Sequence, residues 1–404
     1  MIIKRQTDYE YHVKKALNKM QKVNKWQYDF ILEIYLLFLS IKGKLNFLQL
    51  GRYGEHKEQR FRNQFEKAFD HLSFNKELLM ENGSGHYTIA FDPSYIAKSG
   101  KSTSGVGWYW SGVAGRSKWG LEIGGIAAID IDNHTGFHLE AVQTPNTLES
   151  GKLLEHYSNL IIARKEQLLQ ISRFIVVDAY FSKGPFVSAM NNNGFEVVSR
   201  LRTDAFLQYP FTGKQKQGRG RPRKFDGKVD YNDLNMNHFT LIEQLEDQKI
   251  LQANVHSKSL KQLINLVVVF TKRKGKWSYK LYFSTDLELG PKLLLDYYKS
   301  RFQIEFVYRD AKQFAGLHDC QARSENKLDF HFNTSLTSVN IAKVTYWLSI
   351  PKTIRPAFSM ADIKTMYYNE LLLNRFISVF GISANKLKNN NRIRELITYG
   401  TIAA

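Results

Sequence analysis

The stretch "RFIVVDAYFSKG", from Arg173 to Gly184, decides the fold class. Its apolar and β-branched first half predicts a buried strand that ends at Asp178. The following "FVSAMNNNG" predicts a short helix with a turn, and "FEVVSRLR" predicts another strand. Alternation of strand and helix along the chain is typical of an α/β core.

Neighbouring segments extend this core. Before it, "HYTIAFDPS" predicts a strand, "LEIGGIAAIDI" and "GFHLEAVQ" predict a hairpin, and "LLEHYSNLIIARKEQLLQ" predicts a helix. After it, "QKILQANVHS", "INLVVVFTK" and "WSYKLYFST" predict strands, and "KLLLDYYKSRFQIEFVYRDAKQFAG" predicts a helix. The predicted regions are a helical domain at 1–82, the first part of the core at 83–203, a basic β-rich insertion at 204–287, the last part of the core with the Glu305 helix at 288–345, and a helical C-terminal region at 346–404.

The charge of the chain points to a polyanionic partner. Lysine and arginine number 57 against 38 acidic residues, so the formal charge is +19 and the sequence pI is about 9.6. Nucleic acid is the leading partner, with an anionic membrane surface as the alternative. The most apolar run, from Phe30 to Ile41, contains Glu33 and is shorter than the roughly 20 residues that span a bilayer, so we expect no membrane span.

The N-terminal residues lack the pattern of a secretory signal, so we expect a cytoplasmic, nucleoid-associated protein. Cys320 is the single cysteine, which excludes an internal disulfide and a zinc site built on cysteine pairs. We expect it to be a small buried residue.

Acidic residues follow several predicted strands. Asp92 and Asp178 come directly after apolar runs, where an α/β core presents side chains to a crevice. Each has an alternative role as a helix N-cap or a turn former. Asp130, Asp132 and Asp204 compete with them, but the first two lie in or beside a predicted hairpin turn. We favour Asp92 and Asp178 because we expect their strands to be neighbours.

A cluster of carboxylates suits one kind of chemistry. Phosphodiester cleavage requires the attacking and leaving oxygens to be held in line, which two divalent ions about 3.5–4 Å apart achieve. Mg²⁺ and Mn²⁺ prefer hard oxygen ligands, so three acids without cysteine or histidine suit them.

The segment "YYKSRFQIEFVYRDAK" carries four polar residues at helical intervals. On a single helix, Tyr298, Arg301, Glu305 and Lys312 lie within an arc of about 60°. A simple alternative is a solvated helix face on which Glu305 pairs with Arg301 and Arg309. The cations beside Glu305 also favour its ionised form, ready to bind a metal ion.

The spacing Tyr-x2-Arg-x3-Glu-x6-Lys, downstream of two strand-end aspartates and a basic β-rich insertion, resembles the signature of bacterial insertion-sequence transposases of the DDE type. The resemblance covers roughly residues 85–345. It implies an RNase H-like mixed sheet flanked by helices and interrupted by the insertion. It also implies that Asp92, Asp178 and Glu305 form a triad that binds Mg²⁺ (or Mn²⁺). Tyr298, Arg301 and Lys312 are then implied to contact phosphates of the DNA.

The resemblance further implies cut-and-paste transposition of an insertion sequence. Such enzymes hydrolyse one strand at the inverted-repeat ends of the element and transfer the freed 3′-OH, often through a hairpinned end, before they join target DNA. Joining two ends suggests a homodimer in a synaptic complex, and we assign the helical region 1–82 to DNA binding. Better-known members place a second acid or a threonine after the first aspartate, whereas Pro93 and Ser94 follow Asp92 here. The alternatives are a catalytically inactive transposase-derived DNA-binding regulator and a structure-selective RNase H-like nuclease.

The insertion contains the most basic stretch of the chain, "KQKQGRGRPRK", with six cations and no acid in eleven residues. Glycine and proline prevent a regular helix, so we expect an extended loop that contacts DNA through Arg219, Arg221, Arg223 and Lys224. "RGRP" resembles the minor-groove hook of chromatin proteins; a generic phosphate-binding loop and a solvated linker are the alternatives. "TKRKGKWSYK", around Trp277, indicates either a base-stacking platform or an ordinary strand-turn-strand edge.

Overall fold

The computed structural model describes residues 4–215, 221–382 and 391–402. The chain divides into two compact units, each assembled from segments that are far apart in the sequence. The first unit contains Met1–His86, Pro93–Thr147 and Gln303–Ala404, and the second unit contains Tyr87–Asp92 and Leu148–Phe302.

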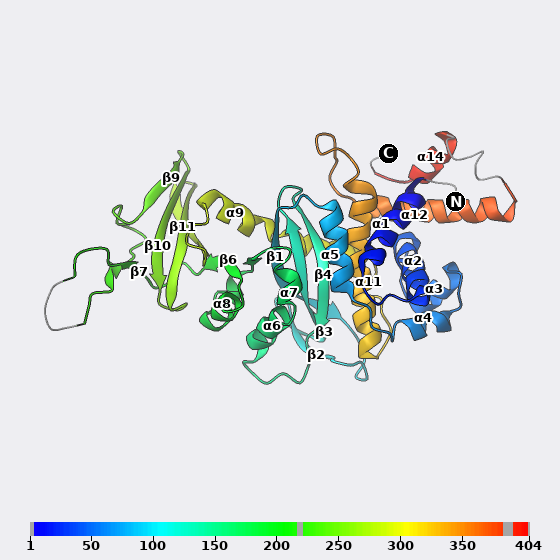
Figure 1. Cartoon of the computed structure of the whole chain (residues 1–404), viewed down its shortest axis with the longest axis horizontal. Coiled ribbons are helices and arrows are strands. Elements are labelled where there is room, and N and C mark those ends of the chain that lie inside the picture. Colours follow the sequence, from blue (N-terminus) through cyan, green and yellow to red (C-terminus); the bar gives the residue numbers. More distant parts are fainter. Residues whose placement is uncertain (1–3, 216–220, 383–390, 403–404) are drawn as a thin grey trace. The chain divides into compact units, whose positions relative to one another are not determined.

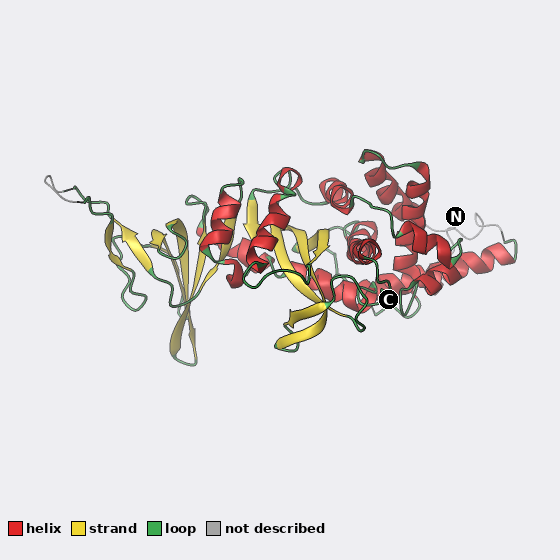
Figure 2. Ribbon diagram, turned by 90° about the horizontal axis from the view of Figure 1, so that it is seen from below, coloured by secondary structure: helices red, strands yellow, loops and turns green. Residues whose placement is uncertain are grey.

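Helices dominate the first unit (Figure 2, helices in red). Asn24, Asn46 and Asp70 are N-caps of three of these helices, and the side chain of each accepts a hydrogen bond from a backbone amide of the first turn. The helices are α1 (Lys4–Lys19), α2 (Lys25–Ser40), α3 (Phe47–Tyr53), α4 (Glu58–Gln64), α5 (His71–Asn82), α10 (Gln303–Phe314), α11 (Glu325–Ala342) with the π-helical turn η2 (Lys343–Trp347), α12 (Met360–Val379) and α14 (Asn391–Thr398). The predicted helical terminal regions are confirmed. Within the described ranges, no helix is long and apolar enough to cross a membrane.

The strands of the first unit form an antiparallel meander of β2 (Gly107–Ser111), β3 (Arg116–Asp130) and β4 (Thr135–Gln143), so the predicted hairpin is confirmed. Helices α5 and α11 run beside β4 (Figure 1). Two buried side chains of α11 bind the backbone of β4: Asn333 exchanges hydrogen bonds with the N–H and C=O of Ala141, and Asn340 does the same with His138. Side chains of α11 thus provide hydrogen-bond partners for the backbone of β4 on the side where another strand would otherwise pair.

The second unit is built on a mixed sheet (Figure 1). Its strand order is β1-β5-β6-β12-β11-β10-β7-β8, with β9 paired to β10. The pairs β1–β5 and β5–β6 are parallel, and the pairs from β6–β12 onward are antiparallel. The bounds are β1 (Tyr87–Ala97, of which the second unit contains residues 87–92), β5 (Phe174–Val176), β6 (Glu196–Leu201), β7 (Leu207–Pro210), β8 (Phe225–Lys228), β9 (Thr240–Gln244), β10 (Gln248–Ser257), β11 (Gln262–Arg273), β12 (Lys276–Ser284), α6 (Leu153–Ile162), α7 (Lys165–Leu168), η1 (Ala179–Phe181), α8 (Gly184–Asn191) and α9 (Pro291–Ser300).

The mixed α/β character is confirmed, as are the three long strands predicted after residue 247, which are β10, β11 and β12. The sequence did not predict β2, β7, β8 or β9. These strands are four or five residues long and are rich in exposed or half-buried positions, so they lack the apolar runs that mark the other strands.

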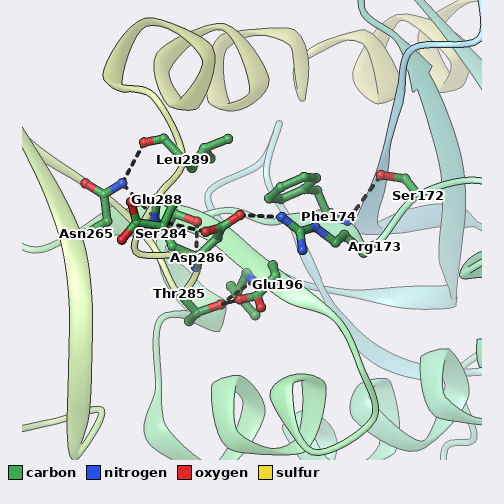
Figure 3. Close-up of polar contacts among 11 residues, drawn as sticks. Ser172, Arg173, Phe174, Glu196, Asn265, Ser284, Thr285, Asp286, Glu288 and Leu289 are labelled. Carbon is green, nitrogen blue, oxygen red and sulfur yellow. Dashed lines mark hydrogen bonds and ion pairs between the residues drawn. The ribbon is translucent and has the colours of Figure 1, made fainter.

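A polar network fixes the sheet at the end remote from Asp178 (Figure 3). Arg173, just before β5, forms an ion pair of 2.6 Å with Asp286, just after β12. Thr285 donates to the carboxylate of Glu196 at the start of β6. These contacts join the beginnings of two parallel strands to the end of an antiparallel one, and they hold β5 and β6 in place for the residues that follow them.

Candidate active site

Asp92 and Asp178 occupy equivalent positions on neighbouring parallel strands. In the β1–β5 register, Ile89 pairs with Ile175 and Ala90 with Val176, and continuing by two residues brings Asp92 opposite Asp178. Neighbouring strands lie about 4.8 Å apart. The expectation that these strands are neighbours is therefore confirmed, and Asp92 and Asp178 lie side by side across them. The prediction that a strand ends at Asp92 is wrong, because β1 continues to Ala97.

An aromatic cluster supports the segment of β1 that carries Asp92. The Phe91 ring, which directly precedes Asp92, contacts the rings of Tyr157 and Phe181 at centroid distances of 5.2 and 5.6 Å. Phe181 also contacts Phe186 of α8 at 5.0 Å. All four rings are at most 1% exposed, so the part of β1 that carries Asp92 rests on a dry, close-packed layer.

Asp178 also has the structural role that a strand-end aspartate commonly takes. Its Oδ1 accepts a hydrogen bond of 2.9 Å from the Tyr180 amide, which caps the short helix η1. The Ser199 hydroxyl donates to the Asp178 carbonyl at 2.9 Å. The first bond orients the side chain, the second holds the backbone of Asp178, and the residue is half-buried.

The competing acids are engaged elsewhere. Asp130 is fully buried and accepts hydrogen bonds from the backbone and side chain of Ser84 and of Asn133, which holds the β3–β4 turn. Asp132 contacts His86 at 3.2 Å, and exposed Asp204 pairs with Arg202. Asp130 therefore has a structural role, and the contacts of the other two acids are local.

The segment predicted as one helix forms two, so that prediction is wrong. Helix α9 ends at Ser300, Phe302 N–H bonds to Lys299 C=O in a 3₁₀-like turn, and α10 begins at Gln303. No proline or glycine marks the break. Its cause is tertiary, because α9 buries apolar residues in the second unit and α10 buries its own in the first. One helical wheel therefore does not describe the four residues of the spaced motif.

Tyr298 and Arg301 lie at the end of α9. A guanidinium nitrogen of Arg301 is 3.8 Å from the Asp92 carboxylate, and both side chains are largely buried, with exposures of 13% and 21%. The Tyr298 ring contacts the Tyr282 ring on β12 at a centroid distance of 5.0 Å. Burial raises the pKa of the Tyr282 phenol, and the neighbouring Tyr298 adds to this effect. The structure thus brings Arg301 to Asp92, a pairing that the spacing of the motif did not predict.

Glu305 and Lys312 lie on α10, seven residues apart and hence on one side of that helix. The Lys312 ammonium donates to the Ser94 hydroxyl at 2.9 Å and to the Tyr95 carbonyl at 3.1 Å. Lys312 therefore anchors the β1 segment that starts two residues after Asp92. Arg309, the alternative ion-pair partner of Glu305, forms a 2.9 Å pair with Asp310.

A known protein family matches a large part of the chain. The family described as "Transposase DDE domain" matches residues 122–341, more than half of the chain. The chain belongs to this family. The part that matches the DDE transposase domain includes Asp178, Arg301, Glu305 and Lys312, whereas Asp92 precedes it. No curated protein matches the chain.

Membership of the DDE transposase family implies transposition as the activity, DNA as the partner and dependence on a divalent metal ion. Among the described residues, no group of three or more His, Cys, Asp or Glu side chains is arranged as the ligands of one ion. The half-buried carboxylates of Asp92 and Asp178 have the hard oxygen donors that Mg²⁺ and Mn²⁺ prefer, so these residues fit such an ion.

The basic loop of this DDE transposase joins β7 to β8. Arg219 lies outside the described residues, and Arg221, Arg223 and Lys224 are exposed. The Arg223 guanidinium is within 3.1 Å of Asp226 and packs over the Phe211 ring. The described parts of the loop contain no helix, as predicted. Arg221, Lys224 and the equally exposed Lys214 are cations of the described part that can meet a polyanion.

Trp277 lies beside the β11–β12 turn, where it pairs with Lys272 across the two strands. Its ring is 5.5 Å from the Lys249 ammonium. The segment is therefore the predicted strand-turn-strand edge. Sequence reasoning missed a different group of exposed tryptophans and lysines, on β2 and the loop before it. The available signal was the absence of any acid between Asp92 and Glu122.

Proposed function

We propose that the chain is a cut-and-paste DNA transposase with an RNase H-like core, acting at the inverted-repeat ends of an insertion sequence. The observation that carries the proposal is the parallel pairing of β1 and β5, whose register brings Asp92 opposite Asp178, in a chain of the DDE transposase family. Parallel central strands that bring two acids side by side support an RNase H-like arrangement.

In this proposal Asp92, Asp178 and Glu305 hold two Mg²⁺ (or Mn²⁺) ions. When bound, such ions polarise the scissile phosphate and lower the pKa of an attacking water. The contribution of the chain is to fix the donors. The aromatic layer under Phe91 and the η1 cap at Asp178 restrict both side chains. Arg301 offsets the repulsion between neighbouring carboxylates through its charge beside Asp92.

DNA contacts in this proposal come from the remaining motif residues and from the insertion. Arg301 presents a planar fork of donors that suits a phosphate, and Tyr298 presents a ring with a hydroxyl. Lys312, bound to Ser94 and Tyr95, combines a phosphate contact with the positioning of β1. Arg219, Arg221, Arg223 and Lys224 bind the backbone of the element end, and two copies of the chain join two ends.

The experiment uses supercoiled plasmid that carries the DNA flanking the gene, with Mg²⁺ and purified protein. We expect Glu305→Gln to abolish cleavage and to leave DNA binding nearly unchanged, because the amide is a poor metal ligand of similar size. Exposed Glu325 on α11 provides the matched control, Glu325→Gln, which keeps cleavage. Normal cleavage by Glu305→Gln would contradict the assignment of the third ligand.

The products separate the alternatives. Joined donor and target molecules from a plasmid with paired inverted ends support transposition. Cleavage without joining favours a structure-selective nuclease, and specific binding with no cleavage by the wild-type protein favours an inactive regulator.

A further inference from the structure

A cavity of about 350 Å³ in the first unit has more cations than acids in its lining. The acid on its wall, Asp319, accepts a hydrogen bond of 2.8 Å from the Leu45 amide, which engages its carboxylate with the protein. The charged and ionisable residues of the wall are Lys44, Lys98, Lys101, His318, Asp319 and Arg323. A basic cavity of this size has room for a phosphate group.

The cavity wall is built by hydrogen bonds within the first unit. The Lys98 ammonium donates to the carbonyl oxygens of Cys320 and Ala322, and the Ser104 amide donates to the Arg323 carbonyl at 2.9 Å. These bonds connect the loop after β1 to the segment after α10. The positive charge of Lys98 is therefore held at a fixed place in the wall.

The β2–β3 hairpin adjoins this cavity. Its register pairs Trp108 with Trp119 and Trp110 with Ser117, so Trp108, Trp110 and Trp119 share one face of the hairpin. Trp108 and Trp110 are 70% and 61% exposed. The Trp119 indole donates to the Gly100 carbonyl at 3.0 Å, and Gly100 lines the cavity. The aromatic face and the basic cavity are therefore parts of one connected surface.

The cations and aromatic rings of this surface indicate the kind of partner that it binds. Residues 93–121 contain Lys98, Lys101, Arg116 and Lys118 and no acid. Cations alone bind any anion, and exposed indoles alone pack on many apolar groups. Their combination fits a single strand of nucleic acid, in which phosphates alternate with flat bases that are free to stack.

We propose that the first unit binds unpaired DNA, with a backbone phosphate in the cavity and bases stacked on Trp108 and Trp110. This surface is additional to the residues proposed for catalysis. The inference rests on the proposed function only in its choice of DNA, since a transposase exposes unpaired strands when it opens element ends.

The experiment measures the binding of a fluorescent oligothymidine to the full-length protein without divalent metal, by anisotropy at several salt concentrations. We expect Trp108→Ala/Trp110→Ala to weaken binding about tenfold or more and to leave the salt slope unchanged, because stacking is lost and phosphate contacts remain. Trp108→Phe/Trp110→Phe retains a stacking ring and should keep most of the affinity.

A second variant tests the cations of the cavity. Lys101→Ala/Arg323→Ala should weaken binding and reduce the salt slope by about one to two, because one or two phosphate contacts are lost. Phe376→Ala, which removes an exposed aromatic ring on α12, and Arg375→Ala, which removes an exposed arginine on the same helix, should bind like the wild type.

The inference is overturned if the wild-type protein does not bind oligothymidine, if it binds the matching duplex equally well, or if the Trp108→Ala/Trp110→Ala protein binds normally. It is also overturned if Phe376→Ala weakens binding as much. Circular dichroism of each variant establishes that it is folded. Cleavage is not part of this test, so failure of the Glu305→Gln experiment leaves this result interpretable.

Discussion

Replacement of Asn340 by alanine tests how the first unit is held together. Asn340 is fully buried on α11. Its amide donates to the His138 carbonyl at 2.7 Å and to Asn75 Oδ1 at 2.9 Å, and its Oδ1 accepts from the His138 amide at 2.9 Å. Alanine removes all three bonds. The N–H and C=O of His138 then lack these partners at a buried strand edge that water does not reach.

The expected loss follows from the groups that are left unpaired. Each buried donor or acceptor without a partner costs about 1–3 kcal/mol. Three such groups, with some relaxation of the Asn75 side chain, lower the free energy of unfolding by about 3–5 kcal/mol. This is a large share of the roughly 5–15 kcal/mol of a typical protein. Asn340→Leu leaves the same groups unpaired while filling the space, so it should be nearly as destabilising.

Urea denaturation followed by circular dichroism measures the loss, and hydrogen exchange at the His138 amide locates it. Asn326→Ala, an exposed change in the same helix, is the control and should alter the free energy of unfolding by no more than about 0.5 kcal/mol. If Asn340→Ala lowers it by less than about 1 kcal/mol, with unchanged exchange at His138, then the asparagine bonds do not hold α11 against β4.

Three further changes test the site and the electrostatics. Asp178→Asn should reduce plasmid cleavage about a thousandfold, equivalent to roughly 4 kcal/mol of transition-state stabilisation. Asp204→Asn is the control and should cleave normally. Similar losses in both variants would contradict the choice of Asp178 over Asp204 as a metal ligand. Lys312→Met should lower the free energy of unfolding by about 1–3 kcal/mol in thermal denaturation, because two hydrogen bonds to β1 are lost, and wild-type stability would disprove the anchoring role. Burial lowers the pKa of Lys364 to about 7, so the folded chain binds fewer protons than the unfolded chain above that pH and its stability rises with pH. Relative to Lys364→Met, the wild type should gain about 2 kcal/mol in urea denaturation between about pH 7 and about pH 9, while a constant difference would contradict the lowered pKa.

The local sequence pattern was sufficient to predict the central strands and to single out two candidate site residues. The apolar runs that end at Asp92 and Asp178 predicted buried strands, and they pair in parallel. The pattern was not sufficient for the helix break after Arg301, because nothing in its composition interrupts a helix. Short exposed strands such as β2 were missed for a related reason, since backbone pairing with β3 stabilises β2 although its tryptophans remain exposed.

The sequence by itself determined the α/β class, the helical termini, the acids that follow apolar runs, and a spaced motif that resembles the signature of DDE transposases. These depend on periodicity and on residue order, which act over a few neighbouring residues. Only the tertiary structure decided that Arg301 meets Asp92, that Lys312 binds Ser94, and that asparagines of α11 complete the edge of β4. Such contacts join residues far apart in the chain, and they form because buried polar groups find partners wherever the packed core brings them together.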